Sequence, residues 1–451
     1  MKLEPVDIGG RIEMFVDSFL IGEKRNVSLR LNKPVRGEIV LRMENKWEQS
    51  GAGIYSTVFK DGDKYRMYYR GFYNPDNDNK NDRVETQYAC YAESADGINW
   101  ERPDLGLVEF FGSKDNNIIM EGARCHNFSP WIDEKPGCPP DEKYKAVCGY
   151  APQGLMAYKS ADGLIWEKMQ ESPVITKGHF DSHNLWFYDV NTRNYRCYSR
   201  IFVGEKHNMI RAIQSCVSDD FLNWSEPVLH EYGDGVPLEH FYTNATVLCP
   251  GAPHIYLSFP MRFVPDRQKM AGYPHKGVSD SVFMTSRDGR HFDRTFREPW
   301  IAPDTDMRNW TQRNYITACG VLETGNGEFS LYTGEHYEWD DARVRRYIAR
   351  KHGFGSVYAD FTGGEFITRP VIFDGDGLYI NYATSAAGFV KVGIMDEKGF
   401  GCEDCEVIYG NELSKKVVWN GGDLSAFSGK PVRLKFMLED ADLFAMSFRN
   451  M

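Results

Sequence analysis

Ser160-Ala-Asp-Gly-Leu-Ile-Trp166 is one copy of a seven-residue pattern that recurs along this chain. The other copies are Ser94-Ala-Asp-Gly-Ile-Asn-Trp100, Ser218-Asp-Asp-Phe-Leu-Asn-Trp224 and Ser286-Arg-Asp-Gly-Arg-His-Phe292, with a degenerate fifth at Arg350-Lys-His-Gly-Phe354. Neighbouring copies lie about 60 residues apart, and a fixed period of this size indicates a repeated supersecondary unit. The repeat therefore predicts the architecture before any single residue predicts the chemistry.

Each full copy of the pattern follows a short run in which apolar and polar residues alternate, as they do in a half-buried strand. The aspartate accepts hydrogen bonds from its own turn and the glycine tolerates positive φ, so the pair predicts a tight turn. The closing aromatic residue begins the next strand and anchors it in the core. We therefore expect the four turn acids to be scaffold: Asp96, Asp162, Asp220 and Asp288.

Five further runs, such as Asp63–Tyr69 and Arg193–Tyr198, give every repeat a second strand, and another apolar stretch precedes each of them. Three or four strands in five units predict a five-bladed β-propeller over residues 1–364. From residue 365 the strand-like runs continue without the turn, which predicts a β-sandwich over residues 365–451. The expected class is all-β, and one large β-sandwich with coincidental turns is the alternative.

The composition excludes several classes of function. The chain has 451 residues and a formal net charge of −11 without a Lys/Arg run, so nucleic acid is not an expected partner. We expect no membrane partner either, because no stretch of about 18 apolar residues occurs. The first residues lack an apolar signal-peptide core, so a cytoplasmic location is expected. Homo-oligomer formation stays open.

The cysteines and one acidic loop offer only weak metal signals. Four of the ten cysteines, Cys90, Cys148, Cys197 and Cys216, lie inside expected strands and are typical of small buried hydrophobes. Cys402 and Cys405 form a C-x-x-C pair, but no second pair completes a zinc site. The loop Asn74–Asp82 alternates acidic oxygens, yet it lacks the glycine and glutamate of a calcium-binding EF-hand loop, which favours a solvated insertion at the rim. No metal or other cofactor is therefore expected.

The inner strands of a propeller converge on a central channel, so side chains at the same end of those strands face one funnel. The expected inner strands begin with residues that suit a sugar ring, namely aromatic faces and in-plane hydrogen-bonding groups. The candidates at these starts are His126, Asn127, His183, Asn184, Tyr242, Asn244, Trp310 and Arg313. The ends of the second strands add Arg70, Arg200, Arg262 and His336.

Four acids are expected near the same rim, and they are the candidate catalytic residues: Asp181, Glu239, Asp280 and Glu335. Glycoside hydrolysis uses two carboxyl groups, of which one is protonated and the other ionised. Each acid also has a structural alternative. Asp181 and Asp280 could be turn residues, Glu239 could pair with Arg262, and Glu335 could neutralise an arginine of residues 343–346.

The order of propeller and sandwich, with Asp-Gly-x-x-Trp turns, resembles the five-bladed glycoside hydrolases of families 32, 43 and 68, and family 32 most closely. The segments that carry this likeness are Phe180-Asp-Ser-His-Asn184, Tyr242-Thr-Asn-Ala245, Gly277-Val-Ser-Asp280, Ser286-Arg-Asp-Gly289 and Glu335-His-Tyr337. By blade position, the resemblance implies that Asp181 is a stabiliser or base, and that Asp280 and Glu335 are acid or nucleophile candidates.

The chain departs from family 32 at the residues that define its activity. The Asn-Asp-Pro-Asn-Gly nucleophile segment, the Arg-Asp-Pro stabiliser and the Glu-Cys acid are all missing. The expected first blade offers only Glu48, Ser50 and Tyr55 before its inner strand. This departure argues against invertase or fructanase activity.

The sequence predicts a glycoside hydrolase that acts from the end of an oligosaccharide or glycoside, with paired carboxylates in the funnel. The segments 71–85 and 262–279 could close such a pocket, and the rim arginines would suit an anionic sugar. One alternative is a glycoside phosphorylase, with phosphate held by Arg262, Arg313 and His336 beside a single acid. A non-catalytic carbohydrate-binding propeller is the other. The sandwich is either a carbohydrate-binding module or a structural cover for a propeller edge.

Overall fold

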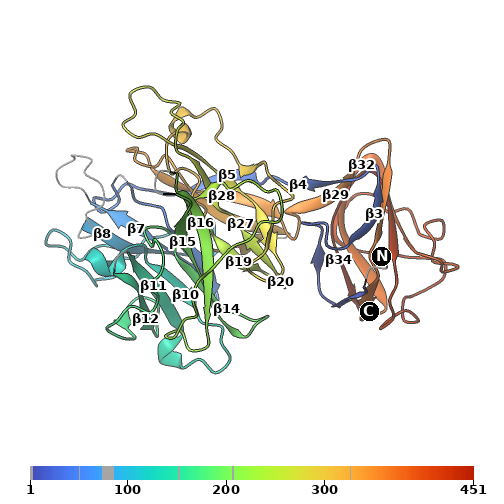
Figure 1. Ribbon diagram of the computed structural model, residues 1–451, viewed down its shortest axis with the longest axis horizontal. Coiled ribbons are helices and arrows are strands. Elements are labelled where there is room, and N and C mark those ends of the chain that lie inside the picture. Colours follow the sequence, from blue (N-terminus) through green and yellow to red (C-terminus); the bar gives the residue numbers. More distant parts are fainter. Residues whose placement is uncertain are drawn as a thin grey trace. The chain divides into compact units, whose positions relative to one another are not determined.

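The computed structural model describes residues 4–49, 51–73, 86–150, 153–205, 208–325 and 327–450, and the loop 74–82 lies outside this range. The chain divides into two compact units (Figure 1). One unit comprises residues 34–348, and the other combines residues 1–33 with residues 349–451. The predicted boundary at 364/365 differs from this division, because the N-terminal strands pair with C-terminal ones and residues 349–364 lie with them.

Five four-stranded antiparallel sheets form the blades of a β-propeller in residues 34–348, as the repeat predicts. The first blade consists of β6 (Thr57–Asp61), β7 (Lys64–Phe72), β8 (Gln87–Ser94) and β9 (Ile118–Glu121). The second consists of β10 (Ser129–Ile132), β11 (Tyr144–Tyr150), β12 (Gly154–Ser160) and β13 (Glu167–Lys168). The third consists of β14 (Leu185–Asp189), β15 (Asn194–Val203), β16 (Ile210–Ser218) and β17 (Val228–Leu229).

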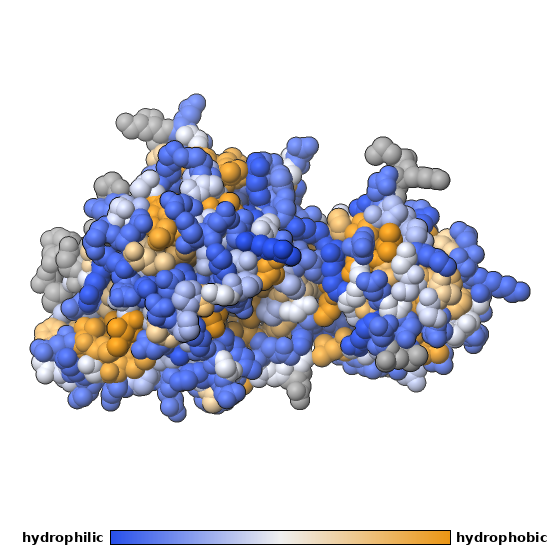
Figure 2. Space-filling model, turned by 90° about the horizontal axis from the view of Figure 1, so that it is seen from below, coloured by the Kyte–Doolittle hydropathy of each residue, from blue (hydrophilic) through white to orange (hydrophobic). Residues whose placement is uncertain are grey.

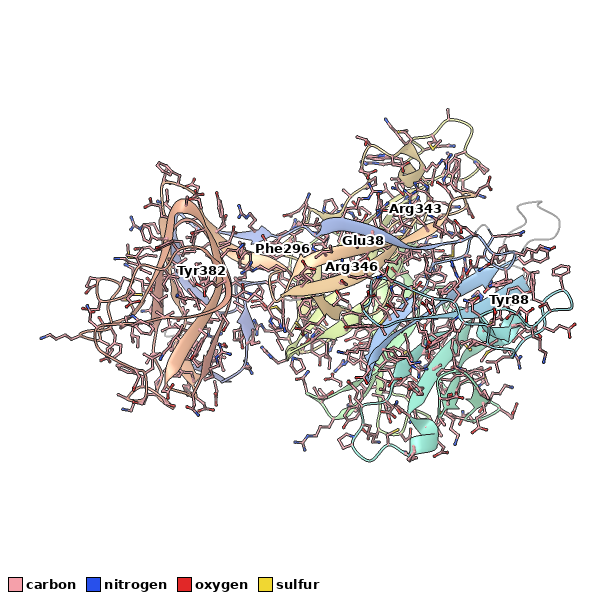
Figure 3. The ribbon with its side chains drawn as sticks, turned by 180° about the vertical axis from the view of Figure 1, so that it is seen from behind. Glu38, Tyr88, Phe296, Arg343, Arg346 and Tyr382 are labelled. Carbon is pink, nitrogen blue, oxygen red and sulfur yellow. The ribbon has the colours of Figure 1, made fainter. Side chains whose placement is uncertain are left out.

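The last two blades complete the ring. The fourth consists of β19 (Thr246–Cys249), β20 (Ala252–Ser258), β23 (Met284–Ser286) and β24 (Phe292–Asp293). The fifth consists of β26 (Leu322–Gly325), β27 (Glu328–Glu335) and β28 (Arg343–Arg350), and β5 (Val35–Arg42) supplies its outer strand. Glu38 of β5 lies beside Arg346 of β28, which donates to it at 3.1 Å (Figure 3). The fifth blade is therefore built from both ends of this unit.

The inner strands lie against one another around the centre. Strand β6 contacts β10, β10 contacts β14, and β14 contacts β19. The first and fifth blades meet where the backbone N–H of Val58 donates to Cys319 O at 2.8 Å. Polar side chains face this centre as well as apolar ones, because Thr57, Ser129 and Thr246 are all buried there.

A further four-stranded sheet extends the fourth blade and was not expected from the sequence. It consists of β18 (His240–Phe241), β21 (Met261–Val264), β22 (Val278–Val282) and β25 (Pro299–Ile301). Three short 3-10 helices also occur in the part of the chain that the structure describes: η2 (Gly122–Cys125), η3 (Pro140–Glu142) and η4 (Met307–Trp310). None of the described helices is long and apolar enough to cross a membrane.

The Asp-Gly segments form tight turns, as predicted. In the second blade, Asp162 Oδ1 accepts from the backbone N–H groups of Leu164 at 2.8 Å and Ile165 at 2.9 Å. The indole of Trp166 donates to Gly163 O at 3.0 Å. The same pair of backbone bonds occurs in the turns that begin at residues 94, 218 and 286. These aspartates are occupied by their own turns, which confirms the scaffold interpretation.

The turns also join neighbouring blades. Tyr68 of the first blade donates to Gly163 O in the turn of the second blade at 3.0 Å. Tyr198 of the third blade donates to Gly289 O of the fourth at 3.1 Å. Tyr332 of the fifth blade donates in the same way to Gly97 O of the first. We call this contact the turn–tyrosine bond.

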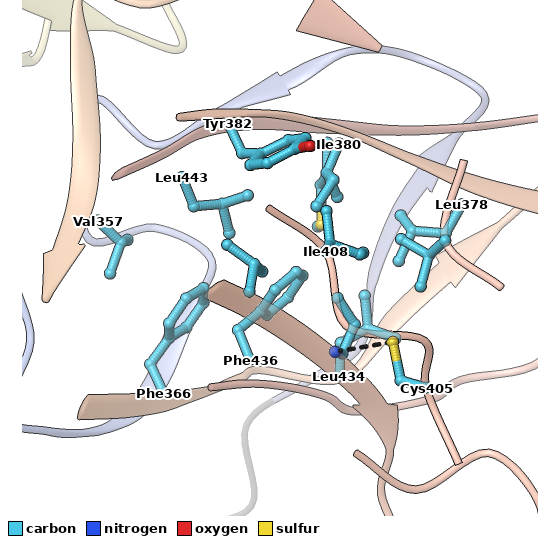
Figure 4. Close-up of a cluster of buried hydrophobic side chains, with 14 of the residues drawn as sticks. Val357, Phe366, Leu378, Ile380, Tyr382, Cys405, Ile408, Leu434, Phe436 and Leu443 are labelled. Atoms are coloured by element: carbon cyan, nitrogen blue, oxygen red, sulfur yellow. Dashed lines mark hydrogen bonds between the residues drawn. The ribbon is translucent and has the colours of Figure 1, made fainter. Parts of the chain in front are cut away.

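The second unit is a β-sandwich assembled from both ends of the chain. Its strands are β1 (Val6–Gly9), β2 (Glu13–Met14), β3 (Ile21–Arg25), β4 (Ser28–Leu31), β29 (Gly355–Ala359), β30 (Gly364–Thr368), β31 (Val371–Phe373), β32 (Gly377–Ile394), β33 (Asn411–Lys416) and β34 (Leu434–Arg449). The long strands β32 and β34 pair along most of their length, with a register shift between Thr384 and Phe389. The sheet encloses a core in which Phe366 and Phe436 stack at 4.8 Å between ring centroids (Figure 4).

Cys402 and Cys405 belong to this unit, and Cys405 is part of its hydrophobic core. Burial raises the pKa of both thiols. The described residues contain no group of three or more His, Cys, Asp or Glu side chains that could hold a metal ion.

Hydrophilic residues cover most of the face seen in Figure 2, with hydrophobic patches between them.

We predict that Gly163→Ala destabilises the propeller more than Gly137→Ala, because only the first change disturbs a turn–tyrosine bond. Both glycines have φ near +80°, but an alanine Cβ at Gly163 would lie 2.6 Å from the hydroxyl oxygen of Tyr68, whereas Gly137 faces open space. Gly137→Ala should cost about 1–2 kcal/mol of backbone strain, and Gly163→Ala about 3 kcal/mol or more. Unfolding in urea measures both, and equal losses would contradict the prediction.

Candidate functional site

Residues with positive φ precede the inner strands of four blades. Tyr55, Asn127 and Ala245, with φ of 52°, 52° and 42°, lie one or two residues before β6, β10 and β19, and Tyr315, with φ of 61°, lies seven residues before β26. Bulky residues rarely adopt positive φ, and such conformations persist only where the surrounding structure enforces them. The strain therefore marks one end of the central channel as the candidate site.

The third blade contributes a carboxylate at this end. Asp181 precedes β14 in a loop that Asn184 holds, because its amide donates to Phe180 O at 2.8 Å and to Ser182 O at 3.0 Å. The hydroxyl of Ser182 donates to Tyr242 O of the fourth blade at 2.7 Å. These bonds fix the loop on both sides, while the side chain of Asp181 remains 50% exposed.

Asp181 is held in its ionised form. Burial raises the pKa of Asp181, but the neighbouring His126 and the positive charges of Arg200 and Arg70 outweigh burial and hold the pKa below its usual range. Nε2 of His126 lies 3.6 Å from Oδ1 of Asp181, and Gln87 Oε1 lies 2.8 Å from Nδ1 on the far side of the ring. The contact with Gln87 fixes the orientation of the imidazole ring, with Nε2 toward the carboxylate.

Aromatic rings and arginines surround this carboxylate. We call the whole group the central cluster, and its members are Tyr55, Arg70, His126, Asp181, Arg200, Arg211, Tyr242, Arg313 and Tyr337. Burial raises the pKa of Tyr55 well above its ordinary range, and the neighbouring Tyr242 and Asp181 raise it further, so this phenol stays protonated. Arg70 lies over the ring of Tyr55 at 5.1 Å.

Tyr337 connects two of the arginines. Its hydroxyl oxygen accepts from Arg313 Nη1 at 2.8 Å and from Arg70 Nη2 at 3.4 Å. Arg70 also donates to Gly51 O through Nε and Nη2, at 3.0 and 2.8 Å. These bonds connect residues of the first and fifth blades, so all five blades contribute residues to the cluster.

The buried amides and imidazole below the cluster are neutral. Burial lowers the pKa of His183 to about 3, so its ring is uncharged, and Nε2 lies 3.3 Å from the Thr57 hydroxyl. Asn127 lies next to His126, 3.2 Å from its Nε2. Asn244 donates to His183 O at 3.3 Å. These three predicted sugar-binding residues are buried and support the neighbouring inner strands.

Glu239 and Asp280 lie together on one arginine in the extra sheet. Asp280 accepts from Nε and Nη2 of Arg262 at 2.9 and 2.6 Å, and Glu239 accepts from Nη1 at 2.8 Å. Arg294 also binds Glu239. Glu239 thus pairs with Arg262, as its structural alternative predicted. Both acids and Arg262 belong to one ion-pair network, which includes no other predicted acid.

Glu335 lies in a second ion-pair network, in the fifth blade. Its side chain is 0% exposed, and its oxygens accept from Arg343 and Arg345, each at 2.9 Å, and from the Tyr347 hydroxyl at 2.9 Å. Burial raises the pKa of Glu335, but Arg345, Arg343 and Arg36 outweigh burial and hold the pKa below its usual range. Without exposed surface, Glu335 has the contacts of a structural residue.

His336 and Trp310 also lie outside the central cluster. Nε2 of His336 lies 2.8 Å from Asp306, and Nδ1 lies 2.9 Å from Asp341. The indole of Trp310 donates to Asp304 O at 2.7 Å. Neither side chain has a described contact with Asp181. The catalytic or binding roles predicted for these residues remain untested predictions.

Three members of the cluster were not selected from the sequence as site residues. Tyr55 precedes the inner strand of the first blade, so a search of all residues at the starts of inner strands would have found it. Arg211 lies on the third strand of its blade, which the search of first and second strands does not cover. Tyr337 follows β27 directly, one residue beyond the predicted His336.

No protein-family model matches this sequence, and no curated protein sequence matches it. Several solved structures have a similar fold at low sequence identity. One is described only as a glycoside hydrolase, at 11% identity and a TM-score of 0.47, covering 71% of this chain and 92% of that one. Another is an N-acetylgalactosamine deacetylase from F. plautii, at 13% identity and a TM-score of 0.46, covering 73% and 96%.

A third similar structure is an exo-inulinase from Aspergillus awamori. It shares 12% identity with this chain at a TM-score of 0.42, and the alignment covers 93% of this chain and 99% of that one.

Replacing Glu335 tests its structural role. We expect Glu335→Gln to lower the free energy of unfolding by about 3–5 kcal/mol, because three arginines would lose their buried counter-charge. Glu38→Gln is the matched control, since Glu38 is 53% exposed and pairs with Arg346 of the same strand β28. The control should cost about 0–1 kcal/mol. A stable Glu335→Gln variant that lost only catalysis would contradict this assignment.

The charge state of Asp181 predicts a pH dependence. Its pKa is lower in the folded protein, so its stabilisation is present at neutral pH and is lost as pH falls from about 4 toward the folded value. Asp181→Asn should therefore lower the unfolding temperature at pH 7, and the difference from the natural chain should shrink at pH 3. Asp115→Asn, at an exposed loop acid, is the control. A difference that grows in acid would contradict the prediction.

Proposed function

We propose that this chain is a glycoside hydrolase and that Asp181 is its ionised catalytic carboxylate. One observation carries the proposal: a half-exposed aspartate at the strained end of the inner strands is kept ionised by His126, Arg200 and Arg70. Groups with a shifted pKa and a specific charge partner cluster at functional sites.

A carboxylate with a lowered pKa suits one of the two roles in glycoside hydrolysis. It can remove the proton from an attacking water or attack the anomeric carbon itself, whereas the acid that protonates the leaving oxygen needs a raised pKa. Tyr55 is a protonated hydroxyl beside Asp181, available to hydrogen-bond to a sugar oxygen. The rings of Tyr55 and Tyr242 belong to the residue class that packs against sugar faces.

A wall near the cluster supports an enzyme that acts from the end of its substrate. Residues 270–274 line a cavity of about 410 Å³ with Glu338 and Trp339. Tyr273 donates to Glu338 at 2.9 Å and stacks on Trp339 at 5.6 Å between centroids. The charge of Glu338 acts on Arg313 of the central cluster. Residues 270–274 belong to the segment 262–279, which the sequence analysis predicts as a possible pocket wall.

The residues that surround Asp181 favour a second candidate function, that of a glycoside phosphorylase. The other three predicted acids are bound in ion-pair networks. The neighbours of Asp181 are therefore arginines and not a second predicted acid. Arginines beside one carboxylate would suit a reaction in which phosphate replaces water. Of the residues predicted for phosphate, only Arg313 lies in the central cluster.

Asp181→Asn should reduce turnover about 10²–10⁴-fold on whichever substrate of an aryl-glycoside and oligosaccharide panel is cleaved, because an amide cannot accept the proton. Asp115→Asn should keep full activity. Measuring turnover with and without inorganic phosphate separates the two candidates, since only a phosphorylase requires it. Full activity in Asp181→Asn would overturn the assignment of the catalytic carboxylate.

A further inference from the structure

Many of the largely buried arginines of the propeller contact a carboxylate. Arg262 binds two acids, Arg343 and Arg345 bind Glu335, and Arg196 binds Asp189 at 3.1 Å. This pattern follows from the high cost of removing a guanidinium from water, which a bound counter-charge offsets. The pairing provides a standard against which other arginines can be compared.

Arg200, Arg211 and Arg313 of the central cluster depart from this standard. Within the described residues none of the three forms an ion pair at 4.0 Å or less, and their hydrogen-bonding partners are neutral. Arg200 donates to His179 O at 3.2 Å, and Arg313 donates to the Tyr337 hydroxyl. Nη1 of Arg211 lies 3.4 Å from Nδ1 of His240, while its Nε is buried without a described partner.

The three guanidinium groups crowd around a single ring. They lie 4.9, 5.2 and 5.9 Å from the centroid of Tyr242, in the order Arg200, Arg211 and Arg313. Burial lowers the pKa of Arg211, and the like charges of Arg200 and Arg313 act in the same direction. Among the carboxylates, Asp181 interacts with Arg200 and Glu338 with Arg313, whereas the main influences on the pKa of Arg211 include no carboxylate.

We propose that Arg200, Arg211 and Arg313 bind an anionic group carried by the saccharide, either a sugar carboxylate or a sulfate ester. This inference rests on the proposed function and names its substrate class. Such a group would form with these arginines the direct ion pairs that they lack within the described residues. The planar donor fork of arginine matches both kinds of anion, and it makes shorter, stronger hydrogen bonds to them than to neutral hydroxyls.

The geometry divides the site into two parts. Asp181 on the third blade faces the reacting bond, while the guanidinium groups around Tyr242 hold the charged substituent of the same sugar ring or its neighbour. A neutral sugar would give the three arginines no ion pair. The site therefore selects charged over neutral glycosides through the free energy of pairing rather than through shape.

Calorimetry with glucuronate, glucose 6-sulfate, glucose and inorganic phosphate tests the inference. We expect at least one of the two anionic sugars to bind at least tenfold more tightly than glucose, with an affinity that falls as salt rises. Arg211→Gln and Arg313→Gln should each lower that affinity tenfold or more. Arg290→Gln is the matched control, because Arg290 is an exposed arginine paired with Glu231 in a blade turn.

Two results would overturn the inference. One is equal binding of glucose and both anionic sugars by the natural chain. The other is binding of inorganic phosphate without binding of either anionic sugar, which would identify a phosphate co-substrate site. Unfolding temperatures of the Arg211→Gln and Arg313→Gln variants confirm that a loss of affinity reflects the site rather than misfolding.

The Asp181→Asn variant separates this inference from the proposed function. Removing the carboxylate leaves the arginines in place and removes a like charge from the anion's surroundings, so anionic sugars should bind at least as tightly as before. If Asp181→Asn keeps full activity but anion binding still depends on Arg211, the catalytic assignment fails and the anion site stands. If the variant loses activity and Arg211→Gln binds normally, the anion site fails alone.

Discussion

The hydrogen bond from a tyrosine of one blade to the turn carbonyl of the next is the contact on which the propeller depends. It recurs between the fifth and first blades, the first and second, and the third and fourth. At each position the glycine has positive φ, and a Cβ would lie 2.6 to 3.1 Å from the tyrosine hydroxyl oxygen. The turn, the glycine and the ring therefore act as one unit that sets the blade spacing.

A frame fixed in this way can hold strained and charged groups at its centre. Residues with positive φ precede the inner strands of four blades, and hydrogen bonds of Asn184 and Ser182 hold the loop of Asp181. The same frame keeps Arg211 and its neighbours close around Tyr242 despite their like charges. Fold stability thus supports an arrangement of like charges that would be unfavourable by itself.

Sequence reasoning predicted most members of the central cluster, but it did not distinguish Asp181 from the acids that lie in ion-pair networks. Strand starts pointed to Asp181, His126, Tyr242 and Arg313, and the structure brings these together. The same reasoning grouped Glu335 with them, although its carboxylate turns into a network of arginines. Position along a strand predicts which end of the channel a residue occupies, but not which of several nearby arginines its side chain reaches.

The sequence by itself determined the repeat, the turns and the number of blades, because each depends on short-range chemistry that recurs at a fixed period. Only the tertiary structure decided that β1 to β4 complete the sandwich and β5 closes the fifth blade, since strand pairing over 300 residues leaves no local pattern. It also decided which charges pair. Whether an arginine is neutralised or left for a ligand depends on distances between blades, which no single segment encodes.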